Sequence, residues 1–129
     1  MQLWEFEEVK RVAPARVQRI LDFALLTGQR PMDIRNARWS DVKEDGIYML
    51  DYKKKKEPYL IPWSPGLRAF IDDLRQNKIL GLYLFPTSRY TRSGFSSAFT
   101  SAMEKALANG KLKEPFQFRD IRALTCTIG

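Results

Sequence analysis

The chain has 129 residues, of which 44% are apolar, including eight Phe and three Trp. This length and composition suit one domain with a single core and exclude a disordered tail. Lys and Arg number 22 against 15 Asp and Glu, which gives a net charge of +7. The excess is compatible with a polyanionic partner, and a well-solvated basic protein explains it equally well.

Cysteine and histidine usage limits the chemistry. The single cysteine, Cys126, excludes an intramolecular disulfide and indicates a reducing compartment. Without a signal-peptide pattern or an apolar stretch of transmembrane length, we expect a cytoplasmic protein with no membrane partner. The absence of histidine removes His-based triads and most zinc sites, so we expect neither a metal nor a cofactor.

The first predicted helix begins at Pro14 and ends at Gly28, a plausible C-cap. Its apolar positions follow the helical spacing: Val17, Ile20, Leu21, Ala24 and Leu25. Pro31 suits the first turn of a second helix. One face of that helix would carry Met32, Ile34 and Ala37.

The period then changes to that of strands. Residues 46–52 (GIYMLDY) and 59–63 (YLIPW) predict two strands, joined by KKKKEP. Pro62 indicates that the second strand is an edge strand or ends there. The alternation of Tyr48, Tyr52 and Tyr59 marks them as packing residues.

Two longer helices and a terminal segment follow. Ser64 and Pro65 begin a helix whose stripe is Leu67, Phe70, Ile71 and Leu74. Ser93 opens another, closed by Asn109 and Gly110, with the stripe Phe95, Ala98, Phe99, Ala102, Met103, Ala106 and Leu107. The segment FQFRDIRALTCTIG begins like a helix. We therefore predict a single mainly α domain with a small antiparallel β-sheet (α+β), burying Leu21, Leu25, Phe70, Leu74, Phe95, Phe99 and Met103.

Cations stand at three places where a solvated surface does not require them. They are Arg30 at a helix junction, the run Lys53 to Lys56 in the hairpin, and the pair Arg119 and Arg122 on one helical face. Each place has a simple explanation: an ion pair of Arg30 with Asp33, lysines that guard a hairpin end, and arginines that flank Asp120.

Taken in order, these places resemble the motifs of the tyrosine recombinases, the phage-integrase family. TGQRPMDIRNARWSDV resembles the first box of that family through Thr27, Gly28, Arg30, Asp33, Trp39 and Asp41. KKKEPYLIP has the spacing of the family's hairpin lysine, with Lys54 eight residues before Pro62. FRDIRALT resembles the second box, with Arg122 at its arginine and Arg119 where a histidine usually stands. The resemblance runs from about residue 12 to residue 125.

The resemblance implies an integrase-like catalytic-domain fold and a DNA-breaking reaction that needs no metal. In the family a tyrosine attacks the scissile phosphate and forms a 3′-phosphotyrosine link. Arg30 and Arg122 would donate paired N–H groups to the phosphate oxygens. Arg119 would contribute only charge and hydrogen bonds, because a guanidinium does not release its proton near neutral pH.

The lysine run would serve the departing group and the DNA backbone. Lys54 would protonate the 5′ oxygen that leaves, although Lys53 and Lys55 are competitors for that role. Lys53, Lys55 and Lys56 would contact double-stranded DNA, the expected partner. Family members assemble as tetramers on DNA, and we expect this chain alone to be a monomer.

The chain also departs from the family pattern. All five tyrosines, Tyr48, Tyr52, Tyr59, Tyr83 and Tyr90, precede the second box, so none matches the nucleophile. Because the first box begins within thirty residues of Met1, we expect no amino-terminal DNA-clamping (core-binding) domain before it. We therefore expect residues 1–129 to be a carboxyl-terminally truncated catalytic domain, of bacterial or phage origin, that binds DNA without cleaving it. The alternatives are a non-catalytic DNA-binding protein or prophage remnant that retains the fold, and a plain basic domain with accidental motifs.

Overall fold

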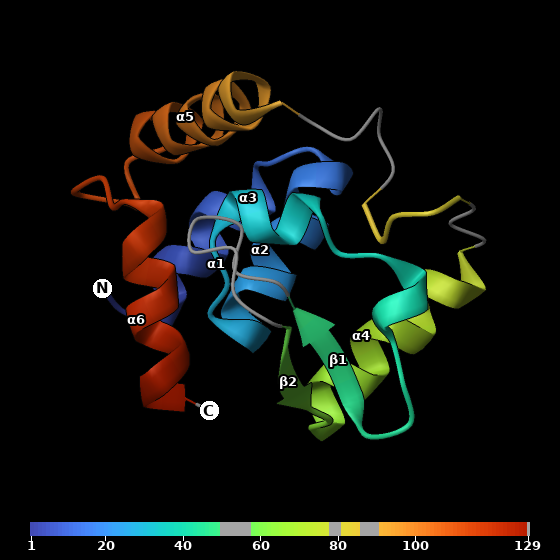
Figure 1. Cartoon of the computed structure of the whole chain (residues 1–129). Helices are drawn as coiled ribbons and strands as arrows, with labels where there is room; N and C mark the ends of the chain where they lie inside the picture. The colour runs from blue at the N-terminus through green and yellow to red at the C-terminus, as the bar shows by residue number, and fades with distance from the viewer. Residues whose placement is uncertain (50–57, 78–80, 86–90, 129) are drawn as a thin grey trace.

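The computed structural model describes residues 1–49, 58–77, 81–85 and 91–128. The chain is mainly helical, with a small antiparallel sheet at one edge of the helices (Figure 1), which confirms the predicted fold class. The described elements, in chain order, are α1 (Leu3–Arg11), α2 (Ala15–Thr27), α3 (Pro31–Arg35), a 3-10 turn η1 (Trp39–Asp41), β1 (Gly46–Met49), β2 (Tyr59–Pro62), α4 (Pro65–Gln76), α5 (Arg92–Ala108) and α6 (Phe118–Ile128).

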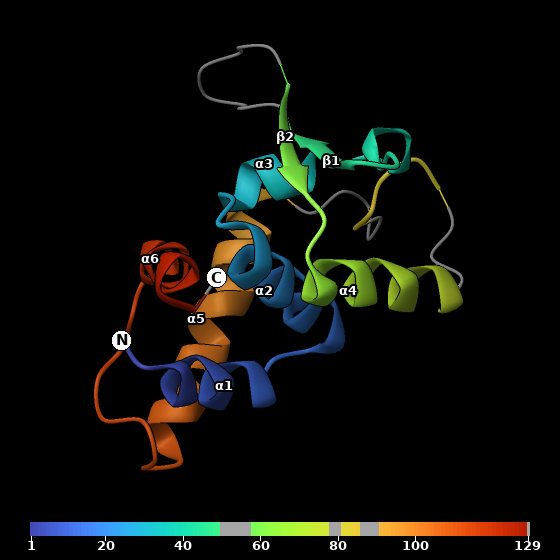
Figure 2. The same cartoon turned by 90° about the horizontal axis from the view of Figure 1, so that it is seen from below.

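Helix α2 is the centre of the packing. It contacts each of the other helices, α1, α3, α4, α5 and α6. Figure 2 shows α6 and α4 on opposite sides of α2, as does Figure 1. The face that α2 buries carries Val17, Ile20, Leu21, Phe23 and Ala24. Because the other helices pack against α2, the position of its last residue determines where the following segment can lie.

The predicted junction after α2 is confirmed. Gly28 ends the helix with φ of 72°, a left-handed conformation that glycine adopts without steric cost, and its N–H donates to the Ala24 carbonyl at 2.8 Å. Pro31 occupies the first turn of α3. That helix is only five residues long, and the Asn36 side chain donates to the Met32 carbonyl at 2.8 Å where it ends.

The predicted hairpin is confirmed with shorter bounds. β1 and β2 pair antiparallel, with Gly46 opposite Pro62 and Met49 opposite Tyr59. β2 ends at Pro62, as a residue without an N–H donor requires. The predicted continuation of the first strand over 50–52 and the lysine run lie outside the described residues.

Two helices follow the hairpin. The start of α4 agrees with the sequence prediction, and the start of α5 differs from it by one residue. Ser64 caps α4, and its hydroxyl accepts from the Leu67 N–H at 3.2 Å. The predicted opening of α5 at Ser93 is wrong: the helix begins at Arg92, and its cap is Thr91, whose hydroxyl accepts from the Gly94 N–H at 2.9 Å. Ser93 and Thr91 are both favourable N-cap residues, so residue type alone does not distinguish between them.

One helix was not predicted. α1 buries only Phe6 and Val9, while Trp4 stays 50% exposed. This stripe is too thin to stand out as an amphipathic pattern, since its apolar residues are divided between the core and the surface. The helix is stabilised instead by packing against α2 and α5.

The burial prediction holds in part. Four of the seven predicted residues are buried in the core: Leu21, Leu74, Phe95 and Met103. Full burial is wrong for the other three, which are partly exposed and pack against the core from its edge: Leu25, Phe70 and Phe99. Among the described helices, none is long and apolar enough to cross a membrane.

Two leucines test this description of the core. We expect Leu74→Ala to lower the free energy of unfolding by about 2–5 kcal/mol, because its side chain is buried and the change leaves a cavity. Leu82→Ala, the same chemical change at a side chain that is 55% exposed, should alter it by less than about 0.5 kcal/mol. Urea unfolding of both variants provides the measurement, and equal losses would contradict the placement of α4 in the core.

Candidate functional site

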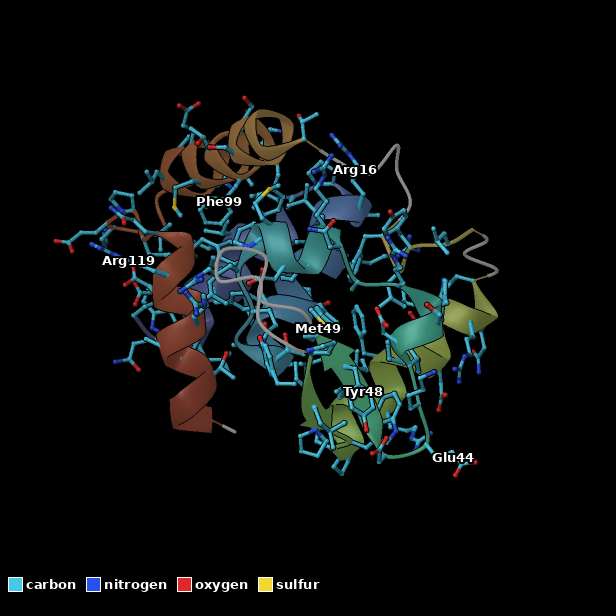
Figure 3. All side chains as sticks on the ribbon, in the orientation of Figure 1. Arg16, Glu44, Tyr48, Met49, Phe99 and Arg119 are labelled. Carbon is cyan, nitrogen blue, oxygen red and sulfur yellow. The ribbon has the colours of Figure 1, made fainter. Side chains whose placement is uncertain are left out.

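Three predicted site residues lie around one cavity. Arg30, Arg119 and Arg122, hereafter the arginine cluster, line a cavity of about 980 Å³ between α3, α5 and the start of α6. Figure 3 shows Arg119 at the start of α6 and Phe99 on the side of α5 that faces α3. The structure therefore brings together cations from the two ends of the sequence. Their chemical roles stay predictions.

Arg30 stands at a constrained position. It is the N-cap residue of α3, with extended backbone angles, and its carbonyl accepts from the Ile34 N–H at 3.0 Å. Gly28 turns the chain just before it, and Pro31 fixes the backbone just after it. The backbone that carries this guanidinium is therefore defined on both sides, and its side chain is half-buried at the cavity.

Arg122 is tied to the same turn. Its Nε donates to the Gly28 carbonyl at 2.8 Å, across 94 residues of sequence. One turn later, the Thr125 hydroxyl donates to the Leu25 carbonyl at 2.8 Å. Both carbonyls belong to the end of α2, where helical partners are lacking. These bonds hold α6 against α2 and set Arg122 beside the turn that carries Arg30.

Arg119 has a looser setting. Its side chain is exposed, one turn before Arg122 at the start of α6. The neighbouring carboxylate of Asp120 accepts from the Gln117 N–H at 2.8 Å and so satisfies a donor at the beginning of the helix. Asp120 thus has a structural role, and Arg119 borders the cavity from its outer side.

Tyr59 has a role beyond the packing that the sequence predicted for it. Its hydroxyl hydrogen-bonds to the side-chain oxygen of Gln29, a buried residue whose amide nitrogen also donates to the Thr27 carbonyl at 3.2 Å. The bond joins β2 to the turn that precedes Arg30. Strand periodicity indicates which face a tyrosine occupies and says nothing of such a long-range partner.

Two carboxylates also line the cavity. Asp33, in the first turn of α3, is buried, and Glu104 lies on the exposed side of α5. Among the charged side chains that line the cavity, three arginines face two carboxylates. The arginines lie at the starts of α3 and α6. The charge that lines the cavity is therefore positive on balance and attracts an anion to these two helix starts.

The cavity also has an aromatic lining that the sequence did not predict. Phe95, Phe99, Phe116 and Phe118, hereafter the aromatic wall, all line it. Phe95 and Phe99 belong to the predicted apolar stripe of α5. The available signal was a second aromatic pair, Phe116 and Phe118, placed directly before the arginine box.

The placement of the other predicted site residues is not described. Lys53, Lys54, Lys55 and Lys56 lie outside the described residues, as do Tyr52 and Tyr90. None of the described tyrosines lines the cavity of the arginine cluster: Tyr48, Tyr59 and Tyr83. In the described part of the chain, no three Asp, Glu, Cys or His side chains are close enough together to hold a metal ion.

The fold resembles that of the lambda integrase catalytic core. The chain superimposes on the lambda integrase catalytic core with a TM-score of 0.75 and 20% identity, covering 96% of this chain and 82% of that one. A lambda integrase dimer bound to a COC′ core site gives a TM-score of 0.78 at 21% identity. A lambda integrase tetramer bound to a Holliday junction gives 0.77 at 21% identity.

These similarities have a defined extent. The chain is covered over 99% in both DNA complexes, but it spans only 50% and 41% of the integrase chains in them. No family model matches the sequence, and no curated protein matches it. The three-dimensional likeness therefore establishes the fold, at a level of sequence identity where the sequence alone gives no match.

The link between Gly28 and Arg122 leads to a prediction. We expect Gly28→Ala and Gly110→Ala each to lower the free energy of unfolding by about 1–2 kcal/mol, because both glycines have positive φ (72° and 79°). Only Gly28→Ala should speed the exchange of the Arg122 Nε–H with water, measured by NMR, because relief of the strained φ at residue 28 reorients the backbone carbonyl that accepts from that group. Equal exchange rates in the two variants would contradict the tether.

Proposed function

We propose that the chain is the phosphate-activating part of a site-specific DNA recombinase of the integrase type. One observation carries the proposal: two arginines far apart in sequence meet at one cavity, with Arg122 anchored to the backbone of the turn that presents Arg30. The shared fold with lambda integrase, which has been solved on a core site and on a Holliday junction, supports duplex DNA as the partner.

The chemistry of strand exchange explains the need for such an arrangement. A phosphodiester under attack gathers negative charge on its non-bridging oxygens as it becomes five-coordinate. Arg122 uses its Nε–H on Gly28, which leaves the four Nη–H donors of its guanidinium to bind those oxygens. A donor positioned in advance is worth about 2.7–4 kcal/mol of the barrier. Rigid attachment to α2 is what provides the positioning.

A second candidate function is DNA binding without chemistry. Two observations favour it: none of the described tyrosines lines the cavity, and an arginine stands where the family uses a histidine. A guanidinium holds its proton near neutral pH, so Arg119 can stabilise charge but cannot transfer a proton. The two candidates share the phosphate site and differ in whether a strand is cut.

The phosphate site predicts a specific binding defect. We expect Arg30→Ala to weaken binding of duplex DNA about tenfold at low salt, equally for unrelated sequences, because it removes a charge-assisted contact to phosphate. The slope of log affinity against log salt should fall by about 1. Fluorescence anisotropy over a salt series measures both quantities.

A charge-matched control separates the site from the net charge. Arg11 pairs with Glu8 at 3.1 Å on α1 and does not line the cavity. Arg11→Ala removes one positive charge as well, and it should leave the affinity within about twofold of the parent. If both variants lose affinity equally, DNA is attracted by overall charge and the cavity is not its site.

A covalent adduct would exclude the second candidate function. Incubation of the chain with a nicked suicide duplex should give no covalent protein–DNA adduct on a denaturing gel, because phosphate activation lowers the barrier only when a nucleophile attacks. A shifted protein band would show that one of the five tyrosines attacks. Recombinase chemistry would then reside in this chain alone.

A further inference from the structure

The cavity of the arginine cluster has two chemically different kinds of lining. Arg30 and Arg122 contribute cations from α3 and α6, and the buried Asp33 of α3 lines the cavity as well. The aromatic wall contributes apolar surface from α5 and from the segment that leads into α6.

A sugar–phosphate backbone that reaches the arginines is polar and has no use for an apolar wall. Phe95 and Phe116 are buried in the core, whereas Phe99 and Phe118 are half-buried at the cavity. Phosphate binding alone does not explain these two partly exposed rings.

The rings of the wall support one another. Phe99 stacks with Phe95 at 6.2 Å between centroids and meets Phe116 and Phe118 edge-on, each at 6.1 Å. Phe95 also meets Phe118 edge-on at 5.6 Å. These separations lie in the range of favourable aromatic pairs. Phe95, Phe99 and Phe118 each contact at least two other rings of the wall, and Phe116 contacts Phe99. The wall is formed before any ligand arrives.

The size and lining of the cavity match a small-molecule site. Such sites have volumes of about 300–1,000 Å³, mostly apolar walls and a few polar groups that fix orientation. Here the volume is about 980 Å³, and polar groups also border the wall on α5, at Ser96, Thr100 and Glu104. Glu104 repels a second anionic group at that position. The chemistry thus favours a ligand with one anionic end and an uncharged body.

We propose that the cavity binds a small aromatic phosphate monoester, with its ring against the aromatic wall and its phosphate on Arg30 and Arg122. An aromatic body fits because ring edges and faces of complementary charge pack well against phenylalanines. The phosphate half rests on the proposed function, since it uses the same arginines. The ligand therefore competes with duplex DNA for the site and acts as an inhibitor of DNA binding.

The test uses 1-naphthyl phosphate, inorganic phosphate and 1-naphthol in ligand-observed NMR titrations. The naphthyl ester should bind about tenfold or more tightly than either half, since burial of its rings adds to the charge-assisted contacts. It should also displace a fluorescent duplex from the protein. Equal affinity of the ester and inorganic phosphate would overturn the proposal, and so would equal affinity of the ester and naphthol.

Two matched variants locate the ligand. Thr100 and Ser101 are neighbouring exposed residues of α5, and only Thr100 lines the cavity. Thr100→Trp should remove the advantage of the ester and leave the affinity for inorganic phosphate unchanged, while Ser101→Trp should change neither. An ester affinity that survives in Thr100→Trp would place the ligand elsewhere and overturn the proposal. The unchanged binding of inorganic phosphate verifies that the variant is folded.

Arg30→Ala distinguishes failure of this proposal from failure of the proposed function. Loss of both ester and inorganic phosphate in that variant supports the shared site. If the parent binds inorganic phosphate through Arg30 and gains nothing from the naphthyl group, the aromatic-ligand proposal fails and the phosphate site stands. If Arg30→Ala alters neither phosphate titration, the phosphate site fails, and both proposals fail with it.

Discussion

The carbonyl of Gly28 joins the two ends of the sequence at the site. Gly28 ends α2, and the last carbonyls of a helix lack helical partners. The Arg122 guanidinium supplies one at 2.8 Å, and the Thr125 hydroxyl does the same for Leu25. Since Arg30 follows the same turn, this hydrogen bond places Arg122 beside the segment that carries Arg30. The site depends on this junction between α2, α3 and α6.

The residues around that turn hold it in place through hydrogen bonds from both sides. Gln29 is buried and bonded to Tyr59, so the hairpin braces the turn from one side while α6 braces it from the other. Of the three arginines, only Arg119 lacks such a frame and stays exposed. This gradation suits a phosphate site in which Arg30 and Arg122 bind in fixed geometry and Arg119 supplies attraction from the rim. The aromatic wall adds an apolar surface to the same cavity, on which we propose that an aromatic group binds.

Much of the fold follows from local signals. Gly28 and Pro31 predict a turn between two helices, and Ser64 marks the start of α4, because each of these residues has a backbone preference that acts within a few residues. The motif order also predicted that Arg30 and Arg122 would meet. What could not be predicted depends on distant contacts. Tyr59 lies in β2 as predicted, but strand periodicity does not indicate its hydrogen bond to Gln29. The phenylalanines of α5 have the same pattern as any core stripe. Helix α1 was missed because its few buried residues leave no clear stripe.

The central claim is that Arg30 and Arg122 bind one DNA phosphate from a common, tethered position. The NMR signals of arginine Nε–H groups, followed during titration with duplex DNA, test it most directly. The account predicts that the Arg30 and Arg122 signals shift together at the same DNA concentration, while the Arg122 Nε–H stays protected from water by Gly28. Shifts confined to other arginines, with Arg30 and Arg122 unmoved at saturating DNA, would contradict it.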